Sequence, residues 1–137
     1  MILTTLTLIC LPLLFAYGSG SVKIGLNYPK TGPYAVQGLD QWRATEMAVE
    51  EINAAGGIVG KQVEIVWRDS ESKPDVTTAN VTELIDKEGV KMVFGGSSSG
   101  VAVACGKVCY SKNVPFFGTL TYSTATTGKE GKRTTFR

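Results

Sequence analysis

Residues 96–100 read Gly-Ser-Ser-Ser-Gly and stand between a short apolar run, 91–94, and a segment of helical character, 101–112. Three hydroxyl groups are therefore expected where a strand ends and a helix begins. Free backbone N–H groups and the positive end of the helix dipole favour an anion at such a junction. The same five residues match G-x-S-x-G, the nucleophile elbow of serine hydrolases, with Ser98 as the nucleophile. The junction leaves two functions open, anion binding and hydrolysis.

On both sides of this junction, expected strands alternate with expected helices. Short apolar or alternating runs predict strands at 22–27, 62–68, 90–94 and 114–117. A first helix is expected from Asp40, as its cap, to about Ala55, where Gly56 and Gly57 stop it. Its apolar residues at helical spacing are Ala44, Met47, Ala48, Ile52 and Ala55.

Two further helices complete the pattern. One begins at Pro74, because the missing N–H of proline costs nothing in the first turn of a helix. Its side chains Val81, Leu84 and Ile85 are expected to point inward, and it ends at Gly89. The other covers 101–112. Segment 118–132 is expected to be an unbroken polar loop.

The order β-α-β-α-β-α-β with short links predicts the α/β class, a doubly wound, mostly parallel sheet with helices on both faces. Ligands of such sheets bind outside the carboxyl ends of the strands. Those ends are the loops 28–38, 69–73, 95–100 and 118–127. Segment 134–137 resembles the start of a further strand, so the chain is expected to be the N-terminal part of a longer protein.

Composition narrows the function. The chain has 137 residues, enough for one domain, and a formal charge of +2, which predicts neither nucleic acid nor a membrane surface as partner. It has no histidine and no C-x-x-C pair, so a zinc site is not expected. Cys105 and Cys109 share a helix face and are expected to be buried. The basic tail residues Lys129, Lys132, Arg133 and Arg137 are expected in a solvated loop.

The first 21 residues differ from the rest. They are almost wholly apolar, and the first charged side chain is Lys23. The apolar core is too short for a comfortable membrane span and ends in small residues, which predicts a secretory signal peptide cleaved within 16–21. One feature is unusual for a signal peptide: the n-region carries no Lys or Arg. From the short apolar core and the small residues that follow it, we expect export to the periplasm without an anchor.

The expected loops suit passive binding. The serines can hold a carboxylate through hydroxyl and helix N–H groups, and Tyr34 and Tyr122 offer aromatic walls with a polar tip. Thr119 and Thr121 add donors and acceptors. The hydrolase alternative has no histidine partner within the chain. A P-loop is disfavoured because Val101, not Lys, follows Gly100.

Two segments carry a resemblance to a known family. Residues 31–38, which include Thr-Gly-Pro-Tyr-Ala, and residues 48–60, which include Asn-Ala-Ala-Gly-Gly-Ile-Val-Gly, closely resemble the periplasmic substrate-binding proteins of branched-chain amino acid and amide ABC transporters. Segments 63–69, 94–100 and 114–117 continue the match. The resemblance implies a Rossmann-like lobe of a type I periplasmic-binding protein over 22–137, with a second lobe outside this chain.

The resemblance also implies a function and a site. The protein would bind a small polar solute by lobe closure, without chemistry and without a cofactor, and would be a monomer. It would deliver the solute to the permease subunits of an ABC importer. Ser97 would hold the ligand carboxylate with Ser98 and Ser99 nearby, and Gln37 would line the pocket beside Tyr34. The ammonium-binding loop would fall at 118–122. That loop departs from the Ser-Pro-x-Ala-Thr-like run of amino-acid binders, which leaves amides and urea open as ligands. The alternatives are a secreted serine hydrolase and the ligand-binding domain of a sensor or receptor.

Overall fold

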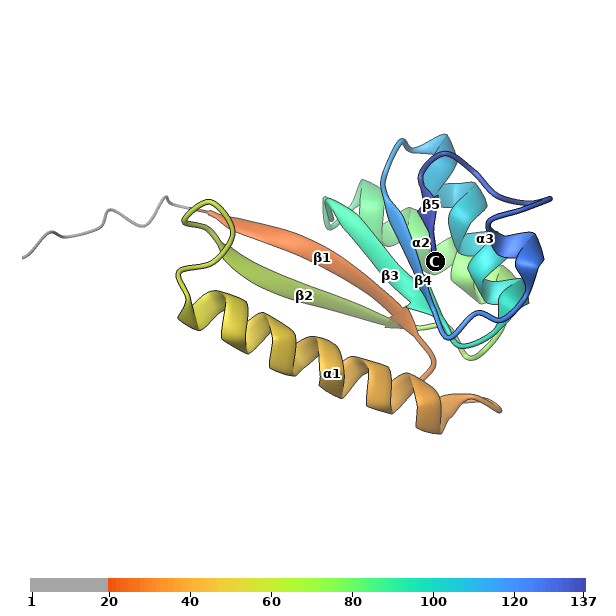
Figure 1. Ribbon diagram of the computed structural model, residues 1–137, viewed down its shortest axis with the longest axis horizontal. Helices are drawn as coiled ribbons and strands as arrows, with labels where there is room; N and C mark the ends of the chain where they lie inside the picture. Colours follow the sequence, from red (N-terminus) through yellow and green to blue (C-terminus); the bar gives the residue numbers. More distant parts are fainter. Residues whose placement is uncertain (1–19) are drawn as a thin grey trace, which may run out of the picture.

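Five strands form one parallel sheet in the order β2-β1-β3-β4-β5 (Figure 1). The computed structural model describes residues 20–137, so nearly all of the expected signal peptide lies outside the described residues. The elements in chain order are β1 Ser21–Tyr28, α1 Ala35–Ala54, β2 Gln62–Asp69, α2 Pro74–Asp86, β3 Met92–Gly96, α3 Ser99–Ser111, β4 Phe116–Thr119, the 3-10 helix η1 Thr124–Thr126 and β5 Thr135–Phe136.

The helices lie on both faces of this sheet. Figure 1 shows α1 along one face, against β1 and β2, while α2 and α3 pack together on the other face. Each helix connects two parallel strands, as crossover connections require. The expected doubly wound parallel sheet is therefore confirmed, and the segment 134–137 contains the further strand, β5 Thr135–Phe136.

The larger apolar core lies between the sheet and the pair α2–α3. Val81 and Leu84 of α2 are fully buried there, as expected, and meet Val93 of β3 and Phe116 of β4. Cys105 and Cys109 are free thiols in the same cluster, which confirms their expected burial. Burial, together with the neighbouring Cys109, raises the pKa of the Cys105 thiol. Both cysteines therefore act as small apolar side chains.

Helix α1 differs from the expectation in its start and in its buried face. Asp40 does not cap it, because Pro33 and Tyr34 turn the chain earlier and Tyr34 O accepts the N–H of Gly38 at 2.9 Å. The expected apolar positions face outward: Met47 is 64% and Ile52 38% exposed. The residues that face the sheet are Gly38, Trp42, Thr45, Val49 and Asn53.

Two contacts fix this rotation of α1. A Cβ on Gly38 would lie 2.0 Å from Pro29 O, so the helix backbone touches the β1–α1 loop directly. Trp42 stacks on Trp67 of β2 with ring centroids 5.0 Å apart. Glycine and tryptophan set the buried face here, and the aliphatic side chains do not.

Several boundaries of strands and helices also differ from the expectation. Strands β3 and β4 both end two residues later than expected, because Gly95 and Gly96 pair in register with Gly118 and Thr119. Glycine fits there because the strands approach closely: a Cβ on Gly95 would lie 3.0 Å from Asn27 O. Helix α2 ends at Asp86, and segment 118–132 contains the end of β4 and η1, so it is not an unbroken loop.

One half of the sheet face on the α1 side carries a row of stacked rings, which we call the aromatic row: Phe94, Phe117 and Phe136. Neighbouring centroids are 5.1 and 5.2 Å apart. Helix α1 packs on β1 and β2, and Phe136 at the end of the row is 50% exposed. Faces of parallel sheets are normally covered, so this half of the face is apolar surface open to solvent in the part of the chain that the structure describes.

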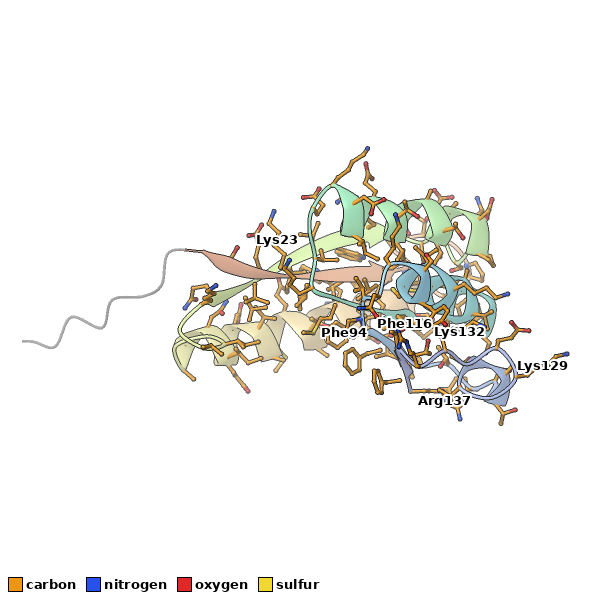
Figure 2. The ribbon with its side chains drawn as sticks, turned by 90° about the horizontal axis from the view of Figure 1, so that it is seen from above. Lys23, Phe94, Phe116, Lys129, Lys132 and Arg137 are labelled. Carbon is orange, nitrogen blue, oxygen red and sulfur yellow. The ribbon has the colours of Figure 1, made fainter. Side chains whose placement is uncertain are left out.

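The basic tail is only partly a solvated loop. Figure 2 shows Lys129, Lys132 and Arg137 at the end of the molecule opposite Lys23. Lys129 is exposed, as expected. Arg137, however, folds back and donates from Nη1 to the carbonyl oxygens of Ser123 at 2.8 Å and Thr121 at 3.4 Å. The arginine therefore holds the loop after β4 in place.

Candidate functional site

Strand β1 has β2 on one side and β3 on the other, so the chain connections leave β1 and β3 in opposite directions. The carboxyl ends of β1, β3 and β4 lie at this position. Such a switch point leaves a crevice between the loops, and it is the usual ligand position in open parallel sheets. The loops that meet here follow Tyr28, Gly96 and Thr119. The first turns of α1 and α3 complete the surroundings.

A pocket of about 170 Å³ lies at this edge, and its lining comes from three separate segments of the chain. None of the lining side chains carries a charge, so any charged ligand would be held here by neutral donors. Six of the eight residues expected in a site are among them. The lining residues are Tyr34, Gln37, Ser97, Ser98, Ser99, Leu120 and Tyr122.

Ser97 has an unusual backbone. Its φ is 65°, in the left-handed region, and the side chain is only 6% exposed. Its N–H donates to Thr119 O at 3.2 Å, which ties the β3–α3 loop to β4. A non-glycine residue in this region costs on the order of 1–2 kcal/mol, so the surrounding contacts must hold it.

Those contacts come from Gln41 in α1. Its amide nitrogen, Nε2, donates to Ser97 Oγ at 2.6 Å and to Gln37 O at 3.0 Å. Its Oε1 accepts from Thr119 Oγ1. One side chain thus joins α1, the end of β4 and the loop of Ser97 and Ser98 between β3 and α3, which we call the serine loop.

Tyr28 extends this network into the core. Its hydroxyl lies 3.3 Å from Thr119 Oγ1. Burial raises the pKa of Tyr28, against the lowering effect of hydrogen bonds with Thr119 and Thr45. The phenol therefore stays protonated at neutral pH and can donate to Thr119.

Ser98 and Ser99 order the start of α3. Ser98 Oγ accepts from the N–H of Val101 at 3.4 Å as the helix cap, and Ser99 Oγ accepts from the N–H of Ser123 at 3.1 Å. The backbone N–H groups of Ser99 and Gly100 have no acceptor among residues 20–137. These free donors lie at the positive end of a 13-residue helix.

The two expected threonines lie beneath the pocket and are absent from its lining. Thr119 belongs to the Gln41 network, and Thr121 is buried with no hydrogen-bond partner for Oγ1 among the described residues. The exposed neighbours of Thr121, Leu120 and Tyr122, reach the lining instead, and Tyr122 is 85% exposed.

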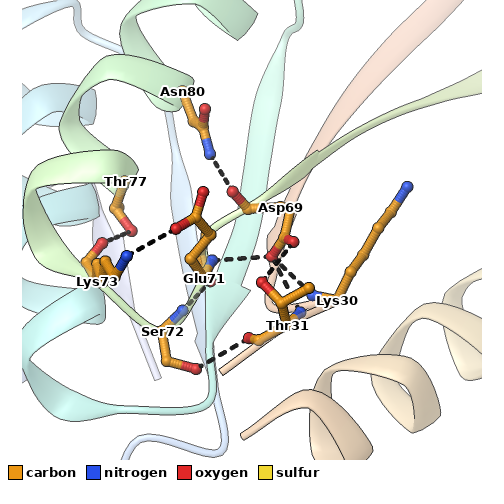
Figure 3. A network of polar contacts seen from close by, with 9 residues as sticks. Lys30, Thr31, Asp69, Glu71, Ser72, Lys73, Thr77 and Asn80 are labelled. Carbon is orange, nitrogen blue, oxygen red and sulfur yellow. Dashed lines mark hydrogen bonds and ion pairs between the residues drawn. The ribbon is translucent and has the colours of Figure 1, made fainter. Parts of the chain in front are cut away.

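A second polar network, centred on Asp69, holds the β1–α1 loop next to the pocket (Figure 3). Asp69 accepts from the N–H groups of Lys30 and Glu71, each at 2.8 Å, and from Thr31 Oγ1 at 2.9 Å. Partial burial raises the pKa of Asp69, but the hydrogen bonds from Glu71, Lys30 and Thr31 outweigh it and hold the pKa below its ordinary value. The carboxylate positions the loop that leads to Tyr34.

This network predicts a pH dependence of stability. The native pKa of Asp69 is depressed, so its contribution is present above the unfolded value of about 3.8 and is lost as the pH falls through the native value. We expect Asp69→Asn to lower the free energy of unfolding at pH 7. The difference from the wild type should shrink between about pH 5 and pH 3. Urea unfolding at a series of pH values measures it.

The matched control for this prediction is Asp40→Asn. Asp40 is an exposed carboxylate whose partner is Arg43 at 3.5 Å, and exposed pairs contribute little. An Asp69→Asn effect that matches the Asp40→Asn effect at every pH would contradict the role of Asp69.

Sequence reasoning missed three residues of this region: Gln41, Leu120 and Asp69. Gln41 follows Gln37 by one helical turn, so the spacing of the two glutamines was an available signal. Leu120 lies inside the expected loop 118–122 between two more conspicuous threonines. Asp69 ends β2 at the correct edge of the sheet, but only the fold shows that it reaches across to Lys30 and Thr31.

The geometry at Ser98 does not support a nucleophile elbow. A nucleophile elbow places the nucleophile itself on the strained turn. Here Ser98 is extended, with φ −146° and ψ 150°, and its hydroxyl caps the helix, while the strained residue is Ser97. Within residues 20–137, no three Cys, Asp or Glu side chains gather as a metal site would require, and none of the helices is long and apolar enough for a membrane span.

Comparisons with known proteins give a consistent result. The model of a family described as periplasmic binding protein matches residues 21–137. The Leu/Ile/Val-binding protein homolog 7 of Brucella abortus (strain 2308) is 39% identical over 102 residues, which cover 74% of this chain and 25% of that protein.

Two solved structures share the fold. The substrate-binding protein LivJ of Streptococcus pneumoniae, in complex with isoleucine, superposes with a TM-score of 0.80 at 32% identity, over 85% of this chain and 33% of that one. A putative branched-chain amino acid ABC transporter protein of Silicibacter pomeroyi gives 0.74 at 30%, over 85% and 31%. The chain thus spans about a quarter to a third of the length of these relatives.

Proposed function

The chain belongs to the periplasmic binding protein family, and on that premise we propose that it forms the ligand-binding N-terminal lobe, residues 22–137, of an exported protein that delivers a small polar solute to an ABC importer. The family is not enzymatic, so Ser98 has no nucleophilic role. The observation that carries the proposal is the pocket at the switch point. It is lined by both Ser97 and Ser99, and the N–H of Ser99 is free at the start of α3.

The donors of this pocket suit a carboxylate. Ser97 and Ser99, whose backbone N–H has no acceptor among residues 20–137, both line the pocket, and no acidic side chain does. Hydrogen bonds to a charged group contribute about 1.5–3 kcal/mol each. Tyr34, Tyr122 and Leu120 add apolar surface for the rest of the solute. A branched-chain amino acid, such as the isoleucine bound by the S. pneumoniae relative, has a carboxylate for the donors and an apolar side chain for the apolar surface.

The small volume of the pocket supports a site that is shared between two lobes, of which this chain supplies one. About 170 Å³ is well below the roughly 300–1,000 Å³ of ordinary ligand pockets. In the proposed mechanism a second lobe closes on the first and encloses the solute, because the closed state binds it more tightly than the open one. The closed monomer then docks on the permease subunits of the importer. The signal peptide at 1–21 accounts for its export.

A titration of the chain tests this function directly. Amide resonances of the ¹⁵N-labelled chain are recorded with isoleucine, isoleucinamide, acetamide and urea at millimolar concentrations, which reveals even weak binding by one lobe. We expect isoleucine to shift the resonances of Ser97 to Gly100. If only urea or acetamide shifts these resonances, the solute is an amide, and the proposal that the pocket binds a carboxylate is wrong. If none of the four has an effect, the proposed solute class is overturned.

Ser97 is expected to contribute the strongest side-chain contact. We predict that Ser97→Ala weakens isoleucine binding by about tenfold or more, which corresponds to about 1.4 kcal/mol per decade. Titration calorimetry or the same NMR series measures it. Ser111→Ala, at the far end of α3, serves as the control, because Ser111 is exposed and its hydroxyl bonds only to Val108 O. Unchanged affinity in Ser97→Ala would remove Ser97 from the site.

A further inference from the structure

We propose that Gln41 is a positioning residue that directs the hydroxyl proton of Ser97 into the pocket, so that the pocket selects a solute with a hydrogen-bond acceptor at that end. This inference rests on the proposed function, since it concerns the same pocket. It assigns the preference for a carboxylate to a side chain that does not line the pocket itself.

The hydrogen bond to Gln37 orients the amide of Gln41. A backbone carbonyl can only accept, so the side-chain atom 3.0 Å from Gln37 O is the nitrogen, Nε2. Oε1 is then the atom next to Thr119 Oγ1, and this is the shortest of the hydrogen bonds open to the Thr119 hydroxyl, since Gly95 O lies 3.2 Å away. With the Thr119 proton on Gln41, the hydroxyl of Tyr28, 3.3 Å away, bonds to Thr119 as a donor.

This orientation determines what Ser97 can do. Both Nε2 protons of Gln41 are used, one on Gln37 O and one on Ser97 Oγ at 2.6 Å. Ser97 Oγ is therefore an acceptor toward Gln41, and its own proton has no acceptor among residues 20–137. The side chain is 6% exposed and lines the pocket, so the proton is available there.

The result is a donor at the Ser97 end of the pocket. The Ser97 hydroxyl adds to the free N–H group of Ser99, which also lines the pocket. A carboxylate supplies acceptors to both, whereas an ammonium or an amide NH₂ group would bring further donors. Binding therefore favours a carboxylate over the matching carboxamide, and Gln41 sets the direction of that preference.

The test is Gln41→Met, which keeps an unbranched side chain of similar length and removes both polar atoms. Without Gln41, no hydrogen bond fixes the direction of the Ser97 proton. We expect isoleucine to bind about tenfold more weakly and isoleucinamide to change by less than about threefold, since bonds to charged acceptors are the stronger ones. Gln62→Met, the same change at an exposed site, is the control. An unchanged ratio of the two affinities overturns the proposal.

A double-mutant cycle separates positioning from general disruption. If Gln41 acts through Ser97, Gln41→Met in the Ser97→Ala background should weaken isoleucine binding by less than about twofold. If the two losses add, Gln41 acts by another route and the proposal is wrong.

A readout without any solute distinguishes this proposal from the proposed function. The side-chain amide protons of Gln41 should exchange with D₂O about tenfold more slowly than those of exposed Gln62, and Ser97→Ala should speed the exchange of one of them. Exchange at the Gln62 rate contradicts the role of Gln41 whatever the chain binds. Slow exchange in a chain that binds none of the solutes contradicts the proposed function alone.

Discussion

Replacing Phe116 with alanine should lower the free energy of unfolding by about 3–5 kcal/mol, the range for a large ring removed from a well-packed core. Phe116, on the side of β4 that faces the helix pair α2–α3, has no exposed surface and belongs to the same buried cluster as Val93, Ala102 and Cys105. Close packing on both sides limits how far the neighbours can collapse into the space. Since domains are stable by only about 5–15 kcal/mol, urea unfolding should show a large loss.

Phe117→Ala is the control for this result. It makes the same truncation at the next residue, but Phe117 belongs to the aromatic row on the open half of the sheet face and is only partly buried. We expect a clearly smaller loss. Equal losses for the two variants would mean that the α2–α3 side of the sheet is not the main core.

Replacing Gly38 with alanine should lower the free energy of unfolding by at least about 3 kcal/mol, the upper end for overpacking. Two effects oppose each other here. Alanine in a helix is favoured over glycine by roughly 1 kcal/mol. The added Cβ, however, would lie 2.0 Å from Pro29 O and 2.8 Å from the proline ring, so α1 or the loop must move. The clash is the larger effect, so we expect a net loss of stability. Thermal or urea unfolding measures whether the free energy of unfolding falls or rises.

Gly100→Ala tests whether the clash is the cause. Gly100 lies in the first turn of α3, and a Cβ there would meet Pro74 Cγ at 3.4 Å, an ordinary contact. This variant should keep its stability or gain a little. A stable Gly38→Ala protein would show that the β1–α1 loop yields easily, which would also weaken the case for a fixed pocket wall at Tyr34 and Gln37.

The order of elements could be predicted from the sequence because each strand and helix carries its own local signal. Pro74 at a helix start, Gly56 and Gly57 at a helix end and the run before Gly96 all act within a few residues. The order β-α-β with short links then leaves few topologies. The pocket followed from the same logic, since the carboxyl ends of parallel strands meet at one edge.

The errors came from contacts between distant segments. The buried face of α1 is set by Gly38 on Pro29 and Trp42 on Trp67, and neither pair is visible as a periodicity. Strands β3 and β4 run through glycines that look like loop residues, because the close approach of neighbouring strands favours them. Gln41 was missed because its role depends on three segments, α1, the serine loop and β4, meeting in space.

The left-handed backbone at Ser97 has a consequence for anyone who engineers this protein. Glycine adopts a φ of 65° without the steric penalty of a side chain, so a search for thermostable variants would favour Ser97→Gly. The variant would lose the backbone strain together with the hydroxyl that accepts from Gln41 and that we expect to hold the solute. Position 97 is thus a point where selection for robustness and selection for transport oppose each other. The serine found there is what selection for transport would retain.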